Sequence, residues 1–379
     1  MKASIRIASP AGIPLRVHWT FILIIAYVVG VQIYHGANAK QSALAAAFVL
    51  AVFACIVLHE LGHALAARRF GIKTRDITLL PIGGLAKLER MPQKPAHELA
   101  VAAAGPAVNI LIAAALAPVI ALTIPFSDIG SALQQQTQNN PGILPLAGPL
   151  FLIQLAIVNI ILVIFNMIPA FPMDGGRALR ATLAMFTDRP TATEAAARLG
   201  QGLAVLLAIA GFFLNPILLI IAVFIFLGAA AEARQARVQA AVAGLTARDA
   251  MITAFHTLKP TDTAHHAIEI FNSSNQTDFP VTNEHNQLLG MLTQQQLEHA
   301  AQANAHDQHI RDIMSAPPEN PPTTDTSLEQ ALNRLQSTGN TAAPVLNNDR
   351  TLAGLLTSHH LASRLSMKPH TARTRQRHP

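Results

Sequence analysis

Apolar residues form long runs over roughly the first 230 positions of the chain, whereas the sequence after Leu245 is polar and rich in Asn, Gln and His. Apolar runs of this length are typical of membrane-spanning helices. We expect six such helices, over residues 19–34, 42–68, 96–124, 144–165, 199–213 and 216–231. The last two runs are short for a bilayer, so their pattern fits a helical hairpin, an extended pair or one re-entrant element.

Composition agrees with a membrane protein, because hydrophobic residues make up 51% of the 379 residues and charged residues only 13%. The predicted fold is a polytopic α-helical membrane protein of about six transmembrane helices, joined to a soluble α/β domain. We place the parts at residues 1–230 for the membrane domain, 231–245 for a linker helix, 246–367 for the soluble domain and 368–379 for a basic, disordered tail.

The net charge of +6 is carried by basic residues beside the predicted helix ends, which indicates membrane topology rather than direct binding of nucleic acid. Lys and Arg gather in residues 68–94 and 177–198, whereas the connection over 125–142 contains neither. Cytoplasmic loops carry such an excess of basic residues. We therefore expect a multi-pass protein of the cell (inner) membrane, with both termini and the soluble domain in the cytoplasm.

A short β-hairpin is predicted between the second and third helices. The segment "TRDITLLPIGGLAKLER", residues 74–90, places β-branched and apolar residues around a Gly-Gly pair. Such a membrane-associated hairpin would offer an edge strand to an extended peptide. A purely structural connector is the alternative.

Three polar residues that can bind metal or transfer protons interrupt the second apolar run. The stretch "CIVLHELGHALAARRFG" carries His59, Glu60 and His63. On a helix the two histidines lie about 40° apart around the axis and roughly 6 Å apart along it, so both can bind one metal ion. Glu60 is then suited to activate a metal-bound water, as in His-Glu-x-x-His hydrolases. Cys55, the single cysteine, excludes an intramolecular disulfide and is expected to be a small apolar filler.

A third metal ligand is expected near the end of the fourth helix. In "NIILVIFNMIPAFPMDGGRALRA", Pro169 and Pro172 break the helix at the cytoplasmic side, and Asp174 follows with two glycines. Catalytic zinc usually has three protein ligands and an open position. Asp174 is the natural third ligand, and a capping carboxylate in an Asp-Gly-Gly turn is the alternative.

These residues resemble the site-2 protease family of intramembrane zinc metalloproteases. The resemblance rests on "HELGH" and on "NMIPAFPMDGG", which matches the family's Asn-x-x-Pro-x-x-Pro-x-Asp-Gly element. It implies His59, His63 and Asp174 as ligands of one Zn²⁺ per chain, Glu60 as general base, and Asn166 as a group that binds the substrate carbonyl or oxyanion. "AAAGPAVNIL" also resembles a family segment, and there Asn109 is expected to make a structural hydrogen bond across the bundle.

The resemblance implies a protease that cleaves membrane-spanning segments near the cytoplasmic face, in regulated intramembrane proteolysis. Its implied substrate is a single-span membrane protein, such as a membrane-tethered transcription-related factor. The alternative is a non-catalytic membrane zinc sensor or an accessory protein of a transporter. Glu60 argues against the alternative, because storage of a metal needs no water-activating carboxylate.

The polar domain contains an internal repeat of about 63 residues. "RDAM" returns as "RDIM", "FPVTN" as "APVLN" and "LLGMLT" as "LAGLLT", in copies over about 246–305 and 309–366. The repeat resembles a tandem cystathionine-β-synthase (CBS) domain pair, which implies regulation and possible homodimer formation. Gln296 and His360 stand where many nucleotide-binding members have a ribose-binding Asp, so nucleotide binding is doubtful.

Overall fold

The computed structural model describes residues 4–357, apart from 82, 132–133, 135–137, 139–145, 147, 275 and 339–340. The chain divides into two compact units, Met1–Ala236 and Arg237–Pro379. The expected tail over 368–379 and His360 lie outside the described residues.

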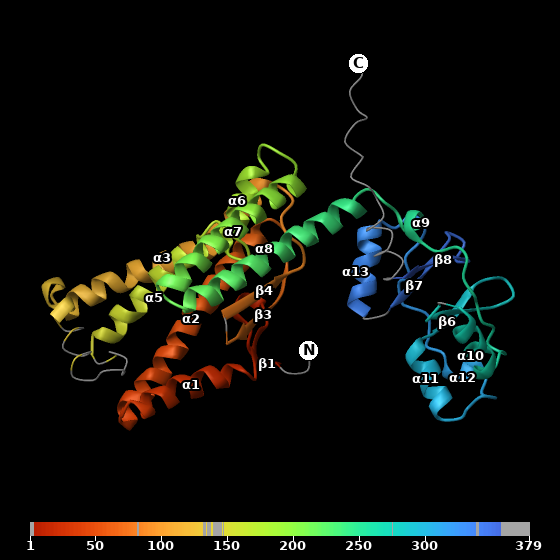
Figure 1. Ribbon diagram of the computed structural model, residues 1–379, viewed down its shortest axis with the longest axis horizontal. Coiled ribbons are helices and arrows are strands. Elements are labelled where there is room, and N and C mark those ends of the chain that lie inside the picture. Colours follow the sequence, from red (N-terminus) through yellow and green to blue (C-terminus); the bar gives the residue numbers. More distant parts are fainter. Residues whose placement is uncertain are drawn as a thin grey trace, which may run out of the picture. The chain divides into compact units, whose positions relative to one another are not determined.

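The first unit is mainly helical (Figure 1). Its helices are α1 (Phe21–Tyr34), α2 (Ala39–Arg69), α3 (Pro95–Thr123), α5 (Leu150–Asn166), α6 (Asp174–Leu183), α7 (Arg189–Phe213) and α8 (Ile217–Val242), with 3-10 turns at Pro10–Gly12 and Phe126–Asp128. Within the described residues, α2, α3, α7 and α8 are long and apolar enough to cross a membrane, and α1 and α5 are shorter apolar helices. This confirms the predicted multi-pass helical fold.

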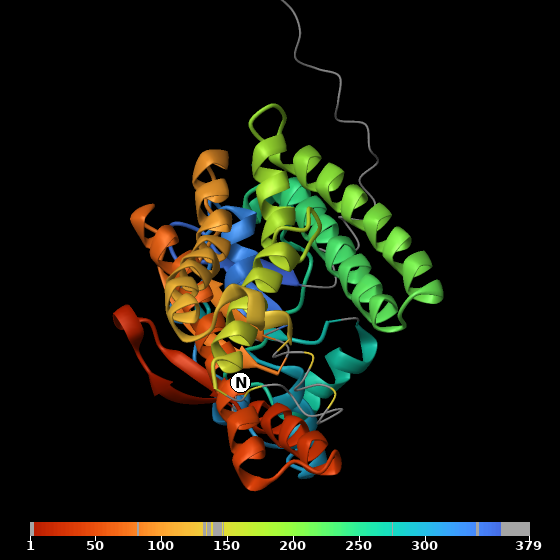
Figure 2. The ribbon, with the colours of Figure 1, turned by 90° about the vertical axis from the view of Figure 1, so that its left-hand side faces the viewer.

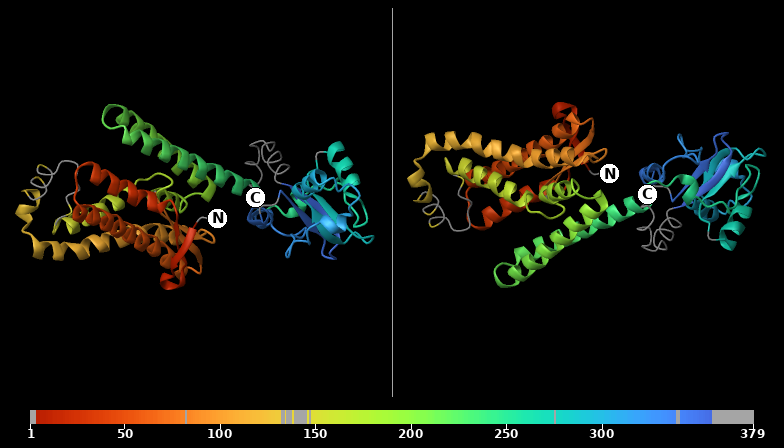
Figure 3. Two further views of the ribbon diagram at one scale, coloured as in Figure 1. Left: turned by 90° about the horizontal axis from the view of Figure 1, so that it is seen from below. Right: turned by 90° about the horizontal axis from the view of Figure 1, so that it is seen from above.

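The last two membrane helices form a hairpin, which settles the choice that hydropathy left open. Helices α7 and α8 lie side by side in Figures 2 and 3 and are 25 and 26 residues long, so both are longer than the apolar runs that predicted them. The Asp188 side chain accepts a hydrogen bond from the backbone N–H of Thr191 and begins α7 well before its apolar part. Helix α8 continues without a break to Val242, and so includes most of the residues 231–245 expected to link the two domains.

A four-stranded sheet accompanies the helices of the first unit. Its strands are β1 (Ser4–Ala8), β2 (Leu15–His18), β3 (Thr74–Leu80) and β4 (Gly83–Leu88), in the order β1-β2-β3-β4 with β2 and β3 parallel. The predicted hairpin is thus β3–β4. Leu15, Ile77 and Leu79 pack against α1 and α2 with Phe21 and Phe53. Strands β1 and β2 were not predicted, although "SIRIA" and "LRVH" alternate apolar and polar residues.

The second unit contains the two repeat copies. Its elements are α9 (Ala247–Ala250), α10 (Ala264–Ser273), β5 (Phe279–Thr282), β6 (Leu288–Leu292), α11 (Gln294–Gln302), α12 (Ile310–Ile313), α13 (Leu328–Thr338), β7 (Ala342–Leu346) and β8 (Leu352–Thr357). Strands β5 and β6 form one antiparallel pair, and β7 and β8 form the other. Before its first long helix, each copy pairs with its own sheet through an isolated bridge, Leu258 with Val281 in the first copy and Thr323 with Leu346 in the second.

Each copy begins with a segment that packs on the other copy. Ala247 and Ala250 of the first copy lie in one cluster with Val345 and Leu356 of the second. Ile310, at the start of the second copy, packs with the core of the first. Neither copy completes its own core, and the pair therefore forms one folding unit.

Candidate metal centre

Three predicted site residues converge inside the first unit. His59 and His63 come from α2, and Asp174 is the first residue of α6. The Oδ2 atom of Asp174 lies 3.2 Å from Nε2 of His59 and 3.0 Å from Nε2 of His63, and the two Nε2 atoms are 3.1 Å apart. All three side chains are buried. Within the described residues they form the single cluster of His, Cys, Asp and Glu with the spacing of a metal site.

The donor atoms fit a zinc ion. Nδ1 of His63 lies 2.7 Å from the carbonyl oxygen of Val101, which can only accept, so Nδ1 carries the proton and Nε2 presents a lone pair. Two imidazole nitrogens and a carboxylate oxygen gathered out of water are stabilised by a cation among them. Tetrahedral ligands at about 2.0–2.1 Å from zinc are about 3.3 Å from one another. The observed separations are close to this value.

Two glycines allow the sharp return that places Asp174 beside the histidines. A Cβ on Gly175 would lie 2.3 Å from the carbonyl oxygen of Ile168, and one on Gly176 would lie 2.5 Å from the carbonyl carbon of Ala170. The chain after α5 therefore folds tightly against the start of α6. Proline residues end α5, and the glycines let its continuation pack.

Glu60 is a residue of α2, and its side chain contacts the sheet. Its Oε2 accepts a hydrogen bond of 3.0 Å from the backbone N–H of Ala86 on β4, and a Cβ on Gly84 would lie 2.7 Å from Glu60 Cγ. Strand β4 is an edge strand of the sheet. The predicted base and the edge of the predicted hairpin are therefore neighbours.

Two asparagines extend the site behind His59. Asn109 of α3 has its Oδ1 2.7 Å from Nδ1 of His59, as expected for a hydrogen bond across the bundle, and its Nδ2 donates to Oδ1 of Asn159 at 3.0 Å. Asn159 is fully buried on α5 and also contacts buried Cys55, with Nδ2 3.4 Å from Sγ. Sequence reasoning missed Asn159, although it is an isolated amide in an apolar helix, where a polar group needs a partner.

Asn166 is not part of this network. It is the last residue of α5 and is half-buried, and its side chain makes no hydrogen bond to the other residues that the structure describes. Its predicted contact is with a substrate.

An ion-pair cluster centred on buried Arg180 and Glu98 holds the helices around the site. Arg180 of α6 donates from Nε to Glu98 of α3 at 2.8 Å and pairs with Glu232 of α8. Arg189, at the start of α7, lies 3.0 Å from the other Glu98 oxygen. The cluster fixes α6, which carries Asp174, against α3, which carries Val101 and Asn109. It was missed because basic residues here were attributed to topology alone.

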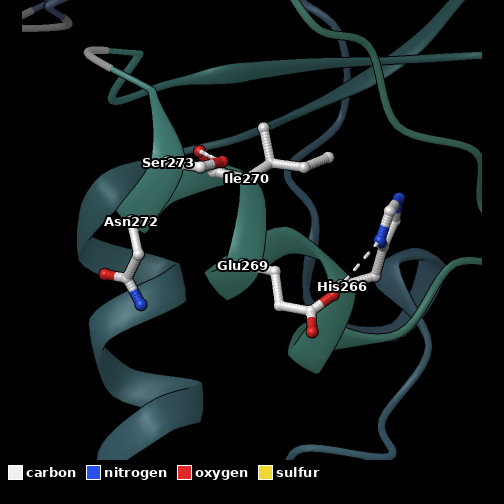
Figure 4. Close-up of a pocket in the computed structure, with 5 residues that line it drawn as sticks. All are labelled: His266, Glu269, Ile270, Asn272 and Ser273. Atoms are coloured by element: carbon white, nitrogen blue, oxygen red, sulfur yellow. Dashed lines mark hydrogen bonds and ion pairs between the residues drawn. The ribbon is translucent and has the colours of Figure 1, made fainter.

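A hollow of about 500 Å³ lies on the second unit and is shown in Figure 4. His266 and Glu269 of its lining form an ion pair of 3.8 Å between exposed side chains. The hollow is open to solvent and has no part in the metal centre.

The Gln296 side chain caps the start of α11 and does not line an open ribose site. Its Oε1 accepts from the backbone N–H and the hydroxyl of Thr293 at 2.9 Å, and its Nε2 donates to the Ser315 hydroxyl at 2.8 Å. Its hydrogen-bonding groups are thus engaged within the protein.

Comparisons with known proteins agree with the geometry. The model of peptidase family M50 matches residues 47–210, and the CBS domain model matches residues 247–302 and 310–367. A zinc metalloprotease of Methanocaldococcus jannaschii is 30% identical over 341 residues, which cover 89% of this chain and 90% of the relative. Rip3 of Mycobacterium tuberculosis, provisionally named a zinc metalloprotease, is 25% identical over 96% of this chain and 93% of its own length.

Among solved structures, the site-2 protease of M. jannaschii is 34% identical, with a TM-score of 0.43, over 61% of this chain and 95% of that chain. The family resemblance inferred from the sequence motifs is confirmed by the relatives. The chain belongs to peptidase family M50, the site-2 proteases, and is a multi-pass membrane zinc metalloprotease with a tandem CBS pair.

Proposed function

We propose that this protein is an intramembrane endopeptidase that cleaves membrane-spanning substrates near the cytoplasmic face. One zinc per chain is held by His59, His63 and Asp174. The observation that carries this proposal is the convergence of their three donor atoms within 4.8 Å of one another. They converge in a unit whose described helices include four that are long and apolar enough to cross a membrane. The bound zinc would act as a Lewis acid toward the scissile carbonyl and a water molecule.

Glu60 is the proposed general base. It removes a proton from the attacking water and later gives a proton to the leaving amine. Its hydrogen bond to the Ala86 N–H holds one carboxylate oxygen in place. Asn166 is proposed to donate its amide N–H to the oxygen on which negative charge develops. Its side chain makes no hydrogen bond to the other described residues, so the amide is available to a substrate.

The edge of β4 is the proposed docking place for the substrate. A helical peptide bond is already hydrogen-bonded and shielded, so the substrate segment has to unwind before cleavage. An unwound segment can pair with the backbone of β4, and this edge carries the N–H that contacts Glu60. The proposed substrate is a single-span protein, such as a membrane-tethered transcription-related factor.

The distribution of Lys and Arg supports a cell (inner) membrane location with both termini and the CBS pair in the cytoplasm.

The CBS pair is proposed to modulate substrate access or to form a homodimer, and α8 is the proposed coupling element. Because the Gln296 side chain is engaged in a cap, we expect weak or no ATP binding. Calorimetric titration of the whole protein with ATP, ADP and AMP tests this; micromolar binding would overturn it.

Metal content and cleavage, measured on the same preparations, test the enzymatic proposal. Wild type should contain near-stoichiometric zinc and should cleave a single-span substrate until a chelator is added. Glu60→Gln should keep its zinc and lose turnover by several orders of magnitude, because the amide preserves shape and removes the base. The His59→Ala, His63→Ala double variant should lose the metal. Full zinc in that variant, or substantial cleavage by Glu60→Gln, would refute the assignment.

A further inference from the structure

We propose that Asn159 is a positioning residue that fixes the tautomer of His59 through Asn109, so that the Nε2 lone pair of His59 faces the metal site. This inference rests on the proposed role of His59 as a zinc ligand. Asn159 itself lies one side chain further from the site and does not touch the ligand set.

The direction of the hydrogen-bond chain follows from its last acceptor. Asn159 Nδ2 donates to the backbone carbonyl of Leu155 at 2.9 Å, and a carbonyl oxygen can only accept. The NH₂ end of Asn159 therefore faces Leu155, and its Oδ1 faces Asn109. Asn109 must donate with Nδ2, which turns its own Oδ1 toward His59.

His59 then has a single compatible form. Asn109 Oδ1 is an acceptor 2.7 Å from Nδ1, so Nδ1 of His59 carries the proton and Nε2 is free to bind a metal. His63 reaches the same state directly, through the Val101 carbonyl. Each imidazole is thus oriented by a backbone carbonyl, one in a single step and the other through two amides.

The need for Asn159 follows from the ambiguity of Asn109. An asparagine side chain can rotate by 180° and present either an oxygen or an NH₂ group to the same neighbour. With NH₂ toward His59, Nδ1 would have to accept, the proton would move to Nε2, and that atom could not bind a metal. Asn109 alone leaves both arrangements available, whereas Asn159 selects one of them.

Zinc affinity measured by competition with a chelator tests the inference on the purified full chain. Asn159→Leu should weaken zinc binding by about 10- to 100-fold, the range for residues that orient metal ligands. Asn109→Asp should rescue Asn159→Leu, because a carboxylate accepts from His59 Nδ1 in either orientation. Cys55→Ala is the matched control: it removes the weak contact on the side of Asn159 and should leave zinc affinity unchanged.

Two outcomes would overturn the inference. Wild-type affinity in a folded Asn159→Leu protein would show that Asn109 needs no orienting partner. Failure of Asn109→Asp to restore affinity in Asn159→Leu, with the Asn109→Asp single variant still binding zinc, would show that the loss is general damage to the fold. If His59→Ala keeps wild-type affinity, the proposed ligand set itself fails, and this result is distinct from the other two.

Discussion

Gly105 gives the sharpest test of the metal centre, because its backbone lies directly against both histidine rings. A Cβ at this position would lie 2.2 Å from Nε2 of His63 and 2.6 Å from Nε2 of His59. Gly105 is inside helix α3, where alanine is intrinsically favoured over glycine by about 1 kcal/mol. Any loss in Gly105→Ala therefore comes from the collision and not from the backbone.

The size of the effect follows from these distances. Carbon and nitrogen in van der Waals contact are about 3.5 Å apart, so the new methyl group would force His63 Nε2 to move by about 1 Å. His63 cannot retreat freely, because its Nδ1 is held by the Val101 carbonyl. Catalytic groups tolerate errors of about 0.5 Å, and a misplacement of 1 Å can cost about 10²-fold in rate. We expect Gly105→Ala to lose at least that much turnover and much of its zinc affinity.

The assay compares zinc content and initial cleavage rate of Gly105→Ala with those of Gly202→Ala. Gly202 lies inside α7, and a Cβ there would meet no atom within 4 Å, so this variant carries the same chemical change without a collision. It should match wild type or be slightly more stable. Wild-type zinc affinity and turnover in Gly105→Ala would refute the position of the two imidazoles against α3.

Further predictions concern the elements that hold the site. Arg180→Met should lower the free energy of unfolding by about 3 kcal/mol, the low end of the cost of breaking a buried ion pair, because buried Glu98 then keeps only the partly exposed Arg189 as a partner. Arg198→Met, on the exposed pair with Glu194, should change the free energy of unfolding by less than about 1 kcal/mol. Thermal unfolding measures both variants, and equal effects would contradict the role of the cluster. Gly175→Ala should abolish zinc binding, as measured by metal analysis, because its Cβ would overlap the Ile168 carbonyl; a zinc-loaded variant would show that the turn before α6 is looser than described.

The metal cluster could be predicted from the sequence because each of its members is costly in an apolar environment without a partner. His59 and His63 lie four residues apart in a long apolar helix, and Asp174 follows a break made by prolines. Helical geometry joins the first two, and the predicted topology, which places Asp174 near the same membrane face as the histidines, brings in the third. The sequence did not predict how the connection between α5 and α6 folds. In the structure, Gly175 and Gly176 allow it to pack closely against the start of α6.

Other features could not be obtained from the same reasoning. Like His59, Asn159 is a polar residue in an apolar helix and therefore needs a partner. An asparagine in such a helix has many possible partners, and the actual partner of Asn159 is 50 residues away on another helix. Strands β1 and β2 are only five and four residues long, and such short alternating runs have weak patterns. The pairing of β2 with β3, and of β1 with β2, depends on tertiary contacts that local propensity does not contain.

The basic residues near the helix ends that we expect to be cytoplasmic show how one sequence signal can have two causes. The positive-inside rule explains why Arg and Lys are frequent there, and it gives no reason for any one of them to be buried. Arg180 is buried nonetheless, stacks 5.1 Å from the centre of the Phe171 ring, and pairs with carboxylates from α3 and α8. A buried arginine needs such partners, because an unpaired charge away from water is strongly destabilising. Since Arg180 lies on the helix that Asp174 begins, the same ion pairs that neutralise it also hold the proposed third zinc ligand in place.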